Sequence, residues 1–307
     1  MMLKLNQKTL RDNIELKGIG LHNGIEVNLI LRPSKPNTGI IFKRVDLKNN
    51  NTIRADFKNV IEPILCTKLE NEYGVSVSTV EHLMAAFYGE GIDNALVEVD
   101  APEIPIMDGS AVDFVDAIRS VGIEEQSEGR KFIKALKKVE VKDGDKYISI
   151  EPLSNDLIID FEIIFNNPLI RTRRKEFKLS NGDLTPIYNS RTFCLYEDID
   201  SIKKLGLAKG GSLKNAIVVQ GDKILNEDGL RNRHEFVYHK ILDCLGDIML
   251  SGNRIFGHIK TSQGGHALTN KLLKKFFSDR SNWNFENSKN LEKQNQNPYV
   301  NSVAIGV

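Results

Sequence analysis

The sequence predicts an α+β fold divided into two domains. Segments that alternate apolar and polar residues, such as VEVD at 97–100 and KYISIEP at 146–152, indicate strands. Only a few stretches show strong helical periodicity, so regular βαβ repetition is not indicated. A charged, glycine-containing segment, GIEEQSEGRK at 122–131, separates a helical pattern from a new strand-like region, and we expect the domain boundary there.

Length and composition narrow the class of protein. The chain has 307 residues, 40% of them hydrophobic, which is enough to fill the cores of two domains. Its formal net charge of +1 excludes the strongly basic surface typical of nucleic-acid binding proteins. The N-terminal segment shows neither a signal peptide nor the run of roughly 18 apolar residues that a membrane span needs. Cys66, Cys194 and Cys244 are far apart and form no CxxC motif, which favours a reducing compartment, the cytoplasm.

A faint internal repeat supports the division into two halves. Residues 78–99 and 235–259 each read as a helical pattern, a glycine break and a strand pattern, although their identity is too low to establish duplication. We therefore expect domains at 1–126 and 127–280. The last segment, 281–307, is rich in asparagine and glutamine and has little periodicity, so we expect a flexible tail.

Residues 236–247, FVYHKILDCLGD, predict a helix with reactive residues on one face. At about 100° of rotation per residue, His239, Asp243 and Asp247 fall together. The opposite face is apolar and comprises Val237, Ile241, Leu245, Ile248 and Met249. An ordinary solvent-exposed face would explain an isolated pair of this kind. A functional face is indicated only because a second helix shows the same feature.

The second helix is predicted from STVEHLMAAFYG, residues 78–89. Its apolar stripe contains Val80, Leu83, Met84 and Phe87. His82 projects to the other side, where its neighbours are the small residues Ala85, Ala86 and Gly89. Small residues allow another layer to approach closely, whereas a solvated face would carry lysine and glutamate. We therefore expect the two helices to oppose each other across a domain interface.

Convergence of these helices would create a metal site. His82, His239 and Asp243 supply two imidazoles and one carboxylate, the set that leaves a fourth position open in catalytic zinc sites. The same set also binds non-haem iron, so the ligands alone fix neither the metal nor the reaction class.

Two further residues suggest general acid–base chemistry. Glu81, next to His82, would be a base that is not itself bound to the metal. The alternative is a capping box, because Ser78–Glu81 reads S-x-x-E. His266 follows two glycines and could protonate a leaving amine, with Asp247 holding its tautomer and raising its pKa. The alternative for His266 is a loop histidine that makes a backbone hydrogen bond.

Several motifs in a fixed order closely resemble those of the UDP-3-O-acyl-N-acetylglucosamine deacetylases, the zinc amidases that commit a sugar nucleotide to lipid A synthesis. They extend from Gly18 almost to residue 280. The motifs are GIGLHNG, STVEHLMAAFYGEGIDNALVEVDAPEIPIMDGSA, SRTF, GGS, NEDGLR, HKILDCLGD and GHALTNKLL.

The resemblance implies a role for each site residue. His82, His239 and Asp243 would bind zinc, Glu81 would be the general base, and His266 the general acid with Asp247 beside it. Thr192 would help polarise the acetyl carbonyl, and the substrate would contact Phe193, Lys240, His22 and Gly210. Simple strand-and-turn packing remains the alternative for Thr192 and Phe193, and a surface lysine for Lys240.

The resemblance also implies a fold and an acyl-chain passage. The family fold consists of two similar domains, each with helices on a sheet, packed helix to helix as a β-α-α-β sandwich. The family insert would line the passage with Leu195, Ile199, Ile202 and Ala208, of which the first three form a helical stripe. An amphipathic helix that closes its own domain is the alternative. Cys66 would lie near the active-site mouth, as an inhibitory metal ligand or a buried structural thiol.

The function implied is release of acetate from UDP-3-O-(3-hydroxyacyl)-N-acetylglucosamine by a cytoplasmic, monomeric enzyme that uses Zn2+, with Fe2+ as an alternative metal in the cell. The substrate is a small molecule with one acyl chain, and neither nucleic acid nor membrane insertion is expected. Two rival functions are an iron-dependent oxygenase and a sugar-nucleotide binding protein with a structural metal.

Overall fold

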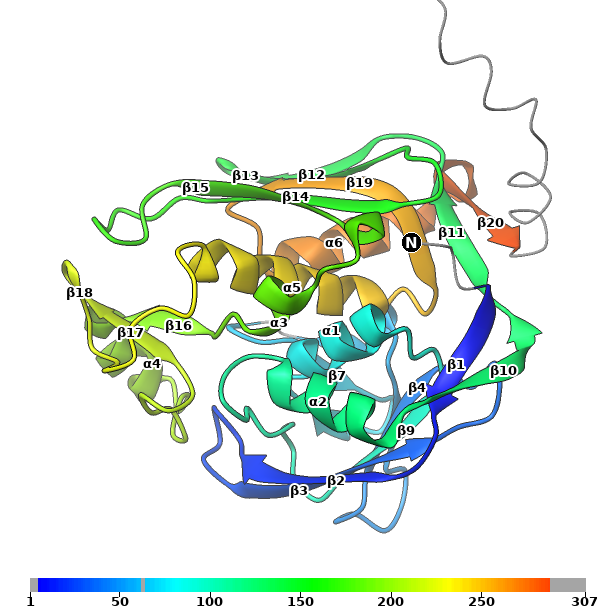
Figure 1. Ribbon diagram of the computed structural model, residues 1–307, viewed down its shortest axis with the longest axis horizontal. Coiled ribbons are helices and arrows are strands. Elements are labelled where there is room, and N and C mark those ends of the chain that lie inside the picture. The colour runs from blue at the N-terminus through cyan, green and yellow to red at the C-terminus, as the bar shows by residue number, and fades with distance from the viewer. Residues whose placement is uncertain (1–4, 62–63, 288–307) are drawn as a thin grey trace, which may run out of the picture.

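A computed structural model describes residues 5–61 and 64–287, and in Figure 1 most of its helices lie between two main sheets. The sheet that contains β2 and β3 lies against α1 and α2, and the sheet that contains β13, β14 and β19 lies against α5 and α6. The layers therefore follow the order sheet, helices, helices, sheet, and the predicted α+β class is confirmed. Within the described residues, no helix is both long and apolar enough to cross a membrane.

The first half of the chain contains nine strands and two α-helices within its described residues: β1 (Asn6–Leu10), β2 (Ile14–Ile19), β3 (Glu26–Pro33), β4 (Ile40–Arg44), β5 (Thr52–Arg54), β6 (Val60–Ile61), β7 (Lys68–Glu70), β8 (Ser76–Val77), α1 (Glu81–Glu90), β9 (Ala95–Val99) and α2 (Val112–Val121). The main sheet has the order β2-β3-β9-β4-β5. Along β3, Val27, Leu29 and Leu31 are buried and alternate with more exposed residues, as expected for a sheet with one covered face.

The second half begins with β10 (Ile123–Gly129), β11 (Lys131–Ala135), β12 (Val139–Asp143), β13 (Lys146–Glu151), β14 (Leu157–Ile163), β15 (Arg173–Lys178), α3 (Thr185–Tyr188) and β16 (Phe193–Leu195). It continues with α4 (Ile199–Lys204), β17 (Ile217–Gln220), β18 (Lys223–Ile224), α5 (Glu235–Met249), β19 (Arg254–Ser262), α6 (His266–Ser278) and β20 (Trp283–Asn287). In its main sheet, β19 pairs with β11, β13 and β14. The predicted strands at 97–100 and 146–152 correspond to β9 and β13.

The segment expected at the domain boundary is regular structure. Residues Ile123–Gly129 form β10, which pairs antiparallel with β1. Since β1 starts the first half, this two-stranded ribbon links the beginning of the chain to the point where the second half starts. The division into domains at 1–126 and 127–280 stays a prediction.

Helix α1 is buried on every side over most of its length. All residues from Glu81 to Tyr88 are buried, as expected for a helix between two layers. The helix ends at Gly91, whose φ of 83° is readily adopted only by glycine and whose N–H donates to the carbonyls of Phe87 and Tyr88. No capping box forms, because the N-cap is Val80 and no side chain caps the helix.

Helix α5 packs against α1 on one side and against β14 and β15 on the other. The approach to α1 is closest at Gly246, where an added Cβ would lie 2.0 Å from the carbonyl oxygen of Glu81. Glycine is therefore the residue that lets the α5 backbone touch the first turn of α1. The predicted opposition of the two helices is confirmed.

Two expectations about the second half differ from the structure. Leu195 does not continue a helical stripe with Ile199 and Ile202, because Leu195 ends β16 and α4 covers only Ile199–Lys204. The pairing of β16 with β17 extends the backbone there and prevents a longer helix. In the segment expected to be a flexible tail, Trp283–Asn287 forms β20 against β11, and the Trp283 ring packs on Phe277. Residues 288–307 lie outside the described part of the chain.

We predict that Gly246→Ala lowers the urea midpoint of unfolding, because the methyl group must push α5 away from the Glu81 carbonyl. Overpacking of this kind costs about 1–3 kcal/mol. Gly265→Ala is the matched control, since an added Cβ there meets no atom within 4 Å and the residue has an extended φ of 178°. Equal midpoints for the two variants would contradict the close helix contact.

Candidate metal centre and catalytic site

The candidate site lies where three helices meet. Glu81 and His82 open α1, His239, Asp243 and Asp247 lie along α5, and His266 is the first residue of α6. All six side chains are buried. Buried ionisable groups need partners, so their contacts define what the site can do.

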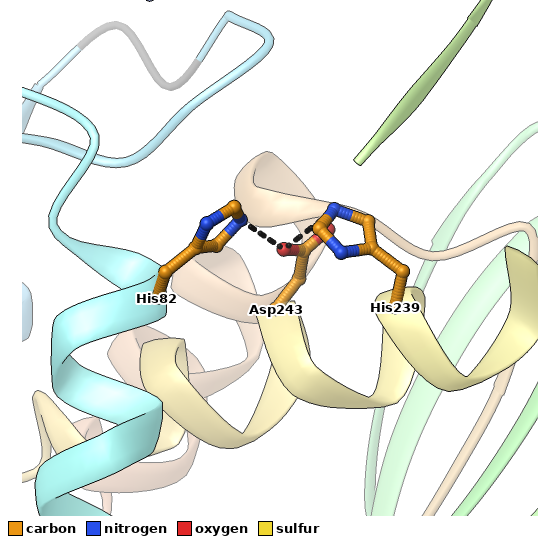
Figure 2. Close-up of side chains that lie close together, drawn as sticks. All are labelled: His82, His239 and Asp243. Atoms are coloured by element: carbon orange, nitrogen blue, oxygen red, sulfur yellow. Dashed lines mark ion pairs between the residues drawn. The ribbon is translucent and has the colours of Figure 1, made fainter. Parts of the chain in front are cut away.

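His82, His239 and Asp243 face one another, as Figure 2 shows. The Nε2 atoms of His82 and His239 lie 3.5 and 3.4 Å from the same oxygen, Oδ1 of Asp243. The two rings are perpendicular, with centroids 5.0 Å apart. One ligand atom from each residue falls within 4.8 Å of the others, so the three can bind one metal ion.

The chemistry of these donors fits a divalent metal. His239 Nδ1 lies 3.0 Å from the carbonyl oxygen of Ser190 and donates to it, which leaves the Nε2 lone pair directed at the site. Burial lowers the pKa of His239 to about 3, so the imidazole is neutral, as a metal ligand must be. Among the described residues, Asp243 Oδ1 is buried without a hydrogen-bond partner, while its Oδ2 accepts from Lys240 Nζ at 2.6 Å. An unpartnered buried carboxylate oxygen between two imidazoles is accounted for by a bound cation.

A row of three ionisable side chains, Glu81, His266 and Asp247, lies beside this centre. Glu81 Oε1 is 3.7 Å from His266 Nε2, and His266 Nδ1 is 2.9 Å from Asp247 Oδ2. The Nδ1–H of His266 therefore points to Asp247, and its Nε2 faces Glu81. Although burial opposes a charge on the imidazole, Asp247 and Glu81 raise the pKa of His266 to about 9. Burial raises the pKa of Glu81, which His266 partly offsets.

Thr67, which is not among the residues predicted from the sequence, connects Glu81 with Asp247. Its N–H donates to Glu81 Oε2 at 3.0 Å, and its hydroxyl donates to Asp247 Oδ1 at 2.5 Å and lies 3.1 Å from His266 Nδ1. Thr67 sits in a loop before β7 with no helical or metal-ligand motif around it. The one available signal was its place next to Cys66, which was expected near the active-site mouth.

Glu103 organises the loop that precedes α1. Its carboxylate accepts from the hydroxyl of Thr79 at 2.9 Å and from the backbone N–H groups of His22 and Asn23 at 2.8 and 2.9 Å. Thr79 has a left-handed φ of 58°, which is unfavourable for a β-branched residue. Glu103 therefore holds the strained turn that determines where α1 begins and thus where Glu81 and His82 lie.

Most of the remaining predicted residues line two adjoining cavities. The first, of about 350 Å³, contains the metal-ligand triad, Glu81 and His266, together with His22, Thr192, Phe193 and Lys240. The second, of about 390 Å³ and mainly apolar, is lined by Ile199, Ile202 and Ala208, and it shares His22, Thr192 and Phe193 with the first. The shared residues place the apolar cavity directly beside the reactive groups.

Two predicted substrate residues do not line these cavities. Leu195 is half-buried and packs against the core as part of β16. Gly210 instead donates its N–H to the carbonyl of Leu21 at 3.0 Å, so it joins the insert to the loop that carries His22. Cys66 is buried, and burial together with Glu81 raises its pKa to about 12, which keeps the thiol protonated at neutral pH.

Comparison with known proteins identifies the family. A family model described as UDP-3-O-acyl N-acetylglycosamine deacetylase matches residues 7–278, nearly all of the described chain. The chain belongs to this family. The UDP-3-O-acyl-N-acetylglucosamine deacetylase of Actinobacillus succinogenes is 45% identical over 304 residues, covering 98% of this chain and 99% of its own length. That of Aliivibrio fischeri is 43% identical over 297 residues, covering 96% of each.

We predict that different residues of this deacetylase-family site perform metal binding and acid–base chemistry. His239→Ala and Asp243→Ala should each lower the content of tightly bound divalent metal at least tenfold, because they remove ligand atoms. His266→Ala should keep the parent's metal content, since His266 contacts Asp247 and Glu81 instead. Elemental analysis of the dialysed proteins measures this. Metal loss in the His266 variant would make His266 a ligand.

Proposed function

We propose that this chain is a zinc-dependent amide hydrolase. It removes acetate from UDP-3-O-(3-hydroxyacyl)-N-acetylglucosamine and leaves a free amine, as a step of lipid A synthesis. The observation that carries the proposal is the pairing of a three-ligand centre with Glu81 and His266 beside a mainly apolar cavity. Family membership supports the substrate, because the relatives are named for this reaction.

Zinc is the proposed metal, held by His82, His239 and Asp243. When bound, zinc polarises a carbonyl and lowers the pKa of water towards about 7. Iron(II) binds to the same kinds of ligand, so the ligand set does not determine which metal is used in the cell. An oxygenase is disfavoured, because Glu81 and His266 provide a base and an acid that amide hydrolysis needs and oxygen chemistry does not.

Glu81 is the proposed general base. Its Oε2 accepts from the Thr67 N–H, which leaves Oε1 facing the cavity that the metal ligands line. A carboxylate whose pKa is raised by burial is a stronger base than an exposed one. It can take the proton of the attacking water without leaving its hydrogen bond to Thr67.

His266 is the proposed general acid. Its Nδ1–H is fixed by Asp247, so Nε2 is the atom that gives a proton to the departing amine. The raised pKa keeps the imidazole protonated at neutral pH. An amine is a poor leaving group until it is protonated, so this proton transfer allows the C–N bond to break.

Thr192, Lys240 and Phe193 are proposed to position the substrate. Thr192 lies at the junction of the two cavities, where its hydroxyl can donate to the oxyanion that develops on the acetyl carbonyl. Lys240 presents a cation beside Asp243 in the polar cavity. Phe193 packs edge to face on Phe236 and lies 6.3 Å from the His239 ring, so it forms an apolar wall next to the ligands.

The apolar cavity is proposed to hold the acyl chain. Ile199 and Ile202 project from α4 into it, and the cavity also includes Ala208 and Val218. Each buried CH₂ group of an acyl chain contributes about 0.8 kcal/mol, so an apolar cavity beside the reactive centre favours a lipid-bearing sugar over a plain one. We propose a cytoplasmic monomer, in keeping with a nucleotide-linked substrate.

We predict chelator-sensitive release of free amine from UDP-3-O-(3-hydroxyacyl)-N-acetylglucosamine. Activity should disappear on chelation and return with added zinc. Glu81→Gln, which keeps the side-chain shape but removes the base, should lower kcat by about 10² or more while keeping the metal. An amine assay with matched metal analysis measures both. Parent protein that holds metal and substrate without releasing amine would indicate a binding protein instead.

We also predict that Thr67 positions the acid and the base. Thr67→Val keeps the N–H bond to Glu81 but removes the hydroxyl from Asp247, so kcat should fall about tenfold or more with KM and metal content near the parent values. Thr67→Ser restores the hydroxyl and should recover most of the activity. A loss of equal size in both variants would show that packing of the methyl group, not the hydroxyl, is what matters.

A further inference from the structure

A second polar cavity lies away from the candidate catalytic site. It has a volume of about 230 Å³ and shares no lining residue with either cavity of that site. Its walls come from the C-terminal end of α5 (Met249), the turn before β4 (Asn37 and Gly39), and strands β5, β11 and β20 (Arg54, Lys131 and Phe285). The cavity thus lies where segments from both halves of the chain meet.

The charged side chains around this cavity are unbalanced. Four cationic residues line it, Arg54, Arg130, Lys131 and Arg254, against one carboxylate, Asp93. The formal net charge of the whole chain is only +1. This cavity therefore concentrates positive charge on an otherwise nearly neutral protein.

Asp93 and the end of α1 account for part of that charge. Arg130 forms a fork with both Asp93 oxygens at 2.8–3.0 Å and also donates to the carbonyl of Gly91. Arg254 donates to the carbonyl of Tyr88, and its guanidinium lies over the Tyr88 ring at 4.5 Å. Cations at the last carbonyls of a helix are favourable, so these two arginines have a structural role as well.

Three other donor groups at the cavity have no such role: Nε of Arg254 and the side chains of Arg54 and Lys131. Arg254 Nε is buried without a hydrogen-bond partner among the described residues and lies 3.9 Å from Asp93. Burial and the neighbouring Arg130 lower the pKa of Arg254. For Arg54, the guanidinium lies against Gly39, with Nη2 3.3 Å from the position of an added Cβ. Within residues 5–61 and 64–287, neither Arg54 nor Lys131 makes a side-chain hydrogen bond or an ion pair that would neutralise it.

We propose that this cavity binds a small, multiply charged oxyanion of the phosphate class, held by Arg54, Lys131 and Arg254. A guanidinium group can donate two parallel hydrogen bonds to the oxygens of a phosphate, and Lys131 adds a point charge at the rim. An anion there would relieve the repulsion between the buried guanidinium groups of Arg130 and Arg254, which both approach Gly91. The proposal does not depend on the deacetylase reaction.

Calorimetric titration of the metal-loaded, full-length protein with inorganic phosphate at constant ionic strength tests this. The variant is Arg54→Gln/Lys131→Gln, whose parent side chains are exposed and can be replaced without loss of core packing. We expect its dissociation constant for phosphate to rise roughly tenfold or more. The matched control, Arg11→Gln/Lys48→Gln, removes two exposed cations elsewhere and should leave the constant unchanged.

Two results would overturn the proposal. One is the absence of binding of both inorganic phosphate and glycerol 3-phosphate to the parent protein, and the other is equal binding by the parent and the Arg54/Lys131 variant, which would assign phosphate to another place such as the catalytic cavity. A parallel titration with glycerol 3-phosphate separates a free phosphate site from one for phosphate esters, and loss of binding in the variant supports the proposal for whichever binds. Unfolding midpoints of the variants, compared with the parent, establish that they fold.

Discussion

Gly246 on α5 touches the carbonyl of Glu81, and this contact between two backbones sets the separation of the helices that carry the site. Side chains of ordinary size at this crossing would hold the helices farther apart. His82 would then move away from His239 and from Asp243, whose Oδ1 lies 3.5 Å from His82 Nε2 across the interface. The glycine is thus as much a part of the metal centre's geometry as the ligands are.

Besides this helix contact, the site depends on keeping each of its buried ionisable groups in a defined protonation state. Ser190 fixes the tautomer of His239, Lys240 neutralises one oxygen of Asp243, and Thr67 holds Asp247. Each of these partners comes from the backbone or from a neutral or cationic side chain, so none competes with the ligands for a metal. Asp247 and Glu81 favour the doubly protonated, charged form of His266, whereas burial favours the neutral form of His239, although both are buried histidines.

Much of the fold and the centre of the site follow from periodicity. Two helices whose reactive residues lie opposite their apolar stripes can only be buried if those faces meet, and so His82, His239 and Asp243 could be brought together from spacing alone. Thr67, Glu103 and Ser190 could not, because each acts through hydrogen bonds from a loop or turn, and no periodic pattern in the sequence indicates which loop lies beside a given helix. Leu195 and Trp283–Asn287 were placed wrongly for a related reason: strand pairing with distant segments overrode the local pattern.

The ligands of the candidate centre come from both halves of the chain, His82 from the first and His239 and Asp243 from the second. A cation bound by all three crosslinks the halves at their interface. Because an unfolded chain does not bring these atoms together, the free energy of binding adds to that of folding. Stability of this protein would then rise with the free concentration of its metal, and metal starvation would weaken the fold and the reaction together.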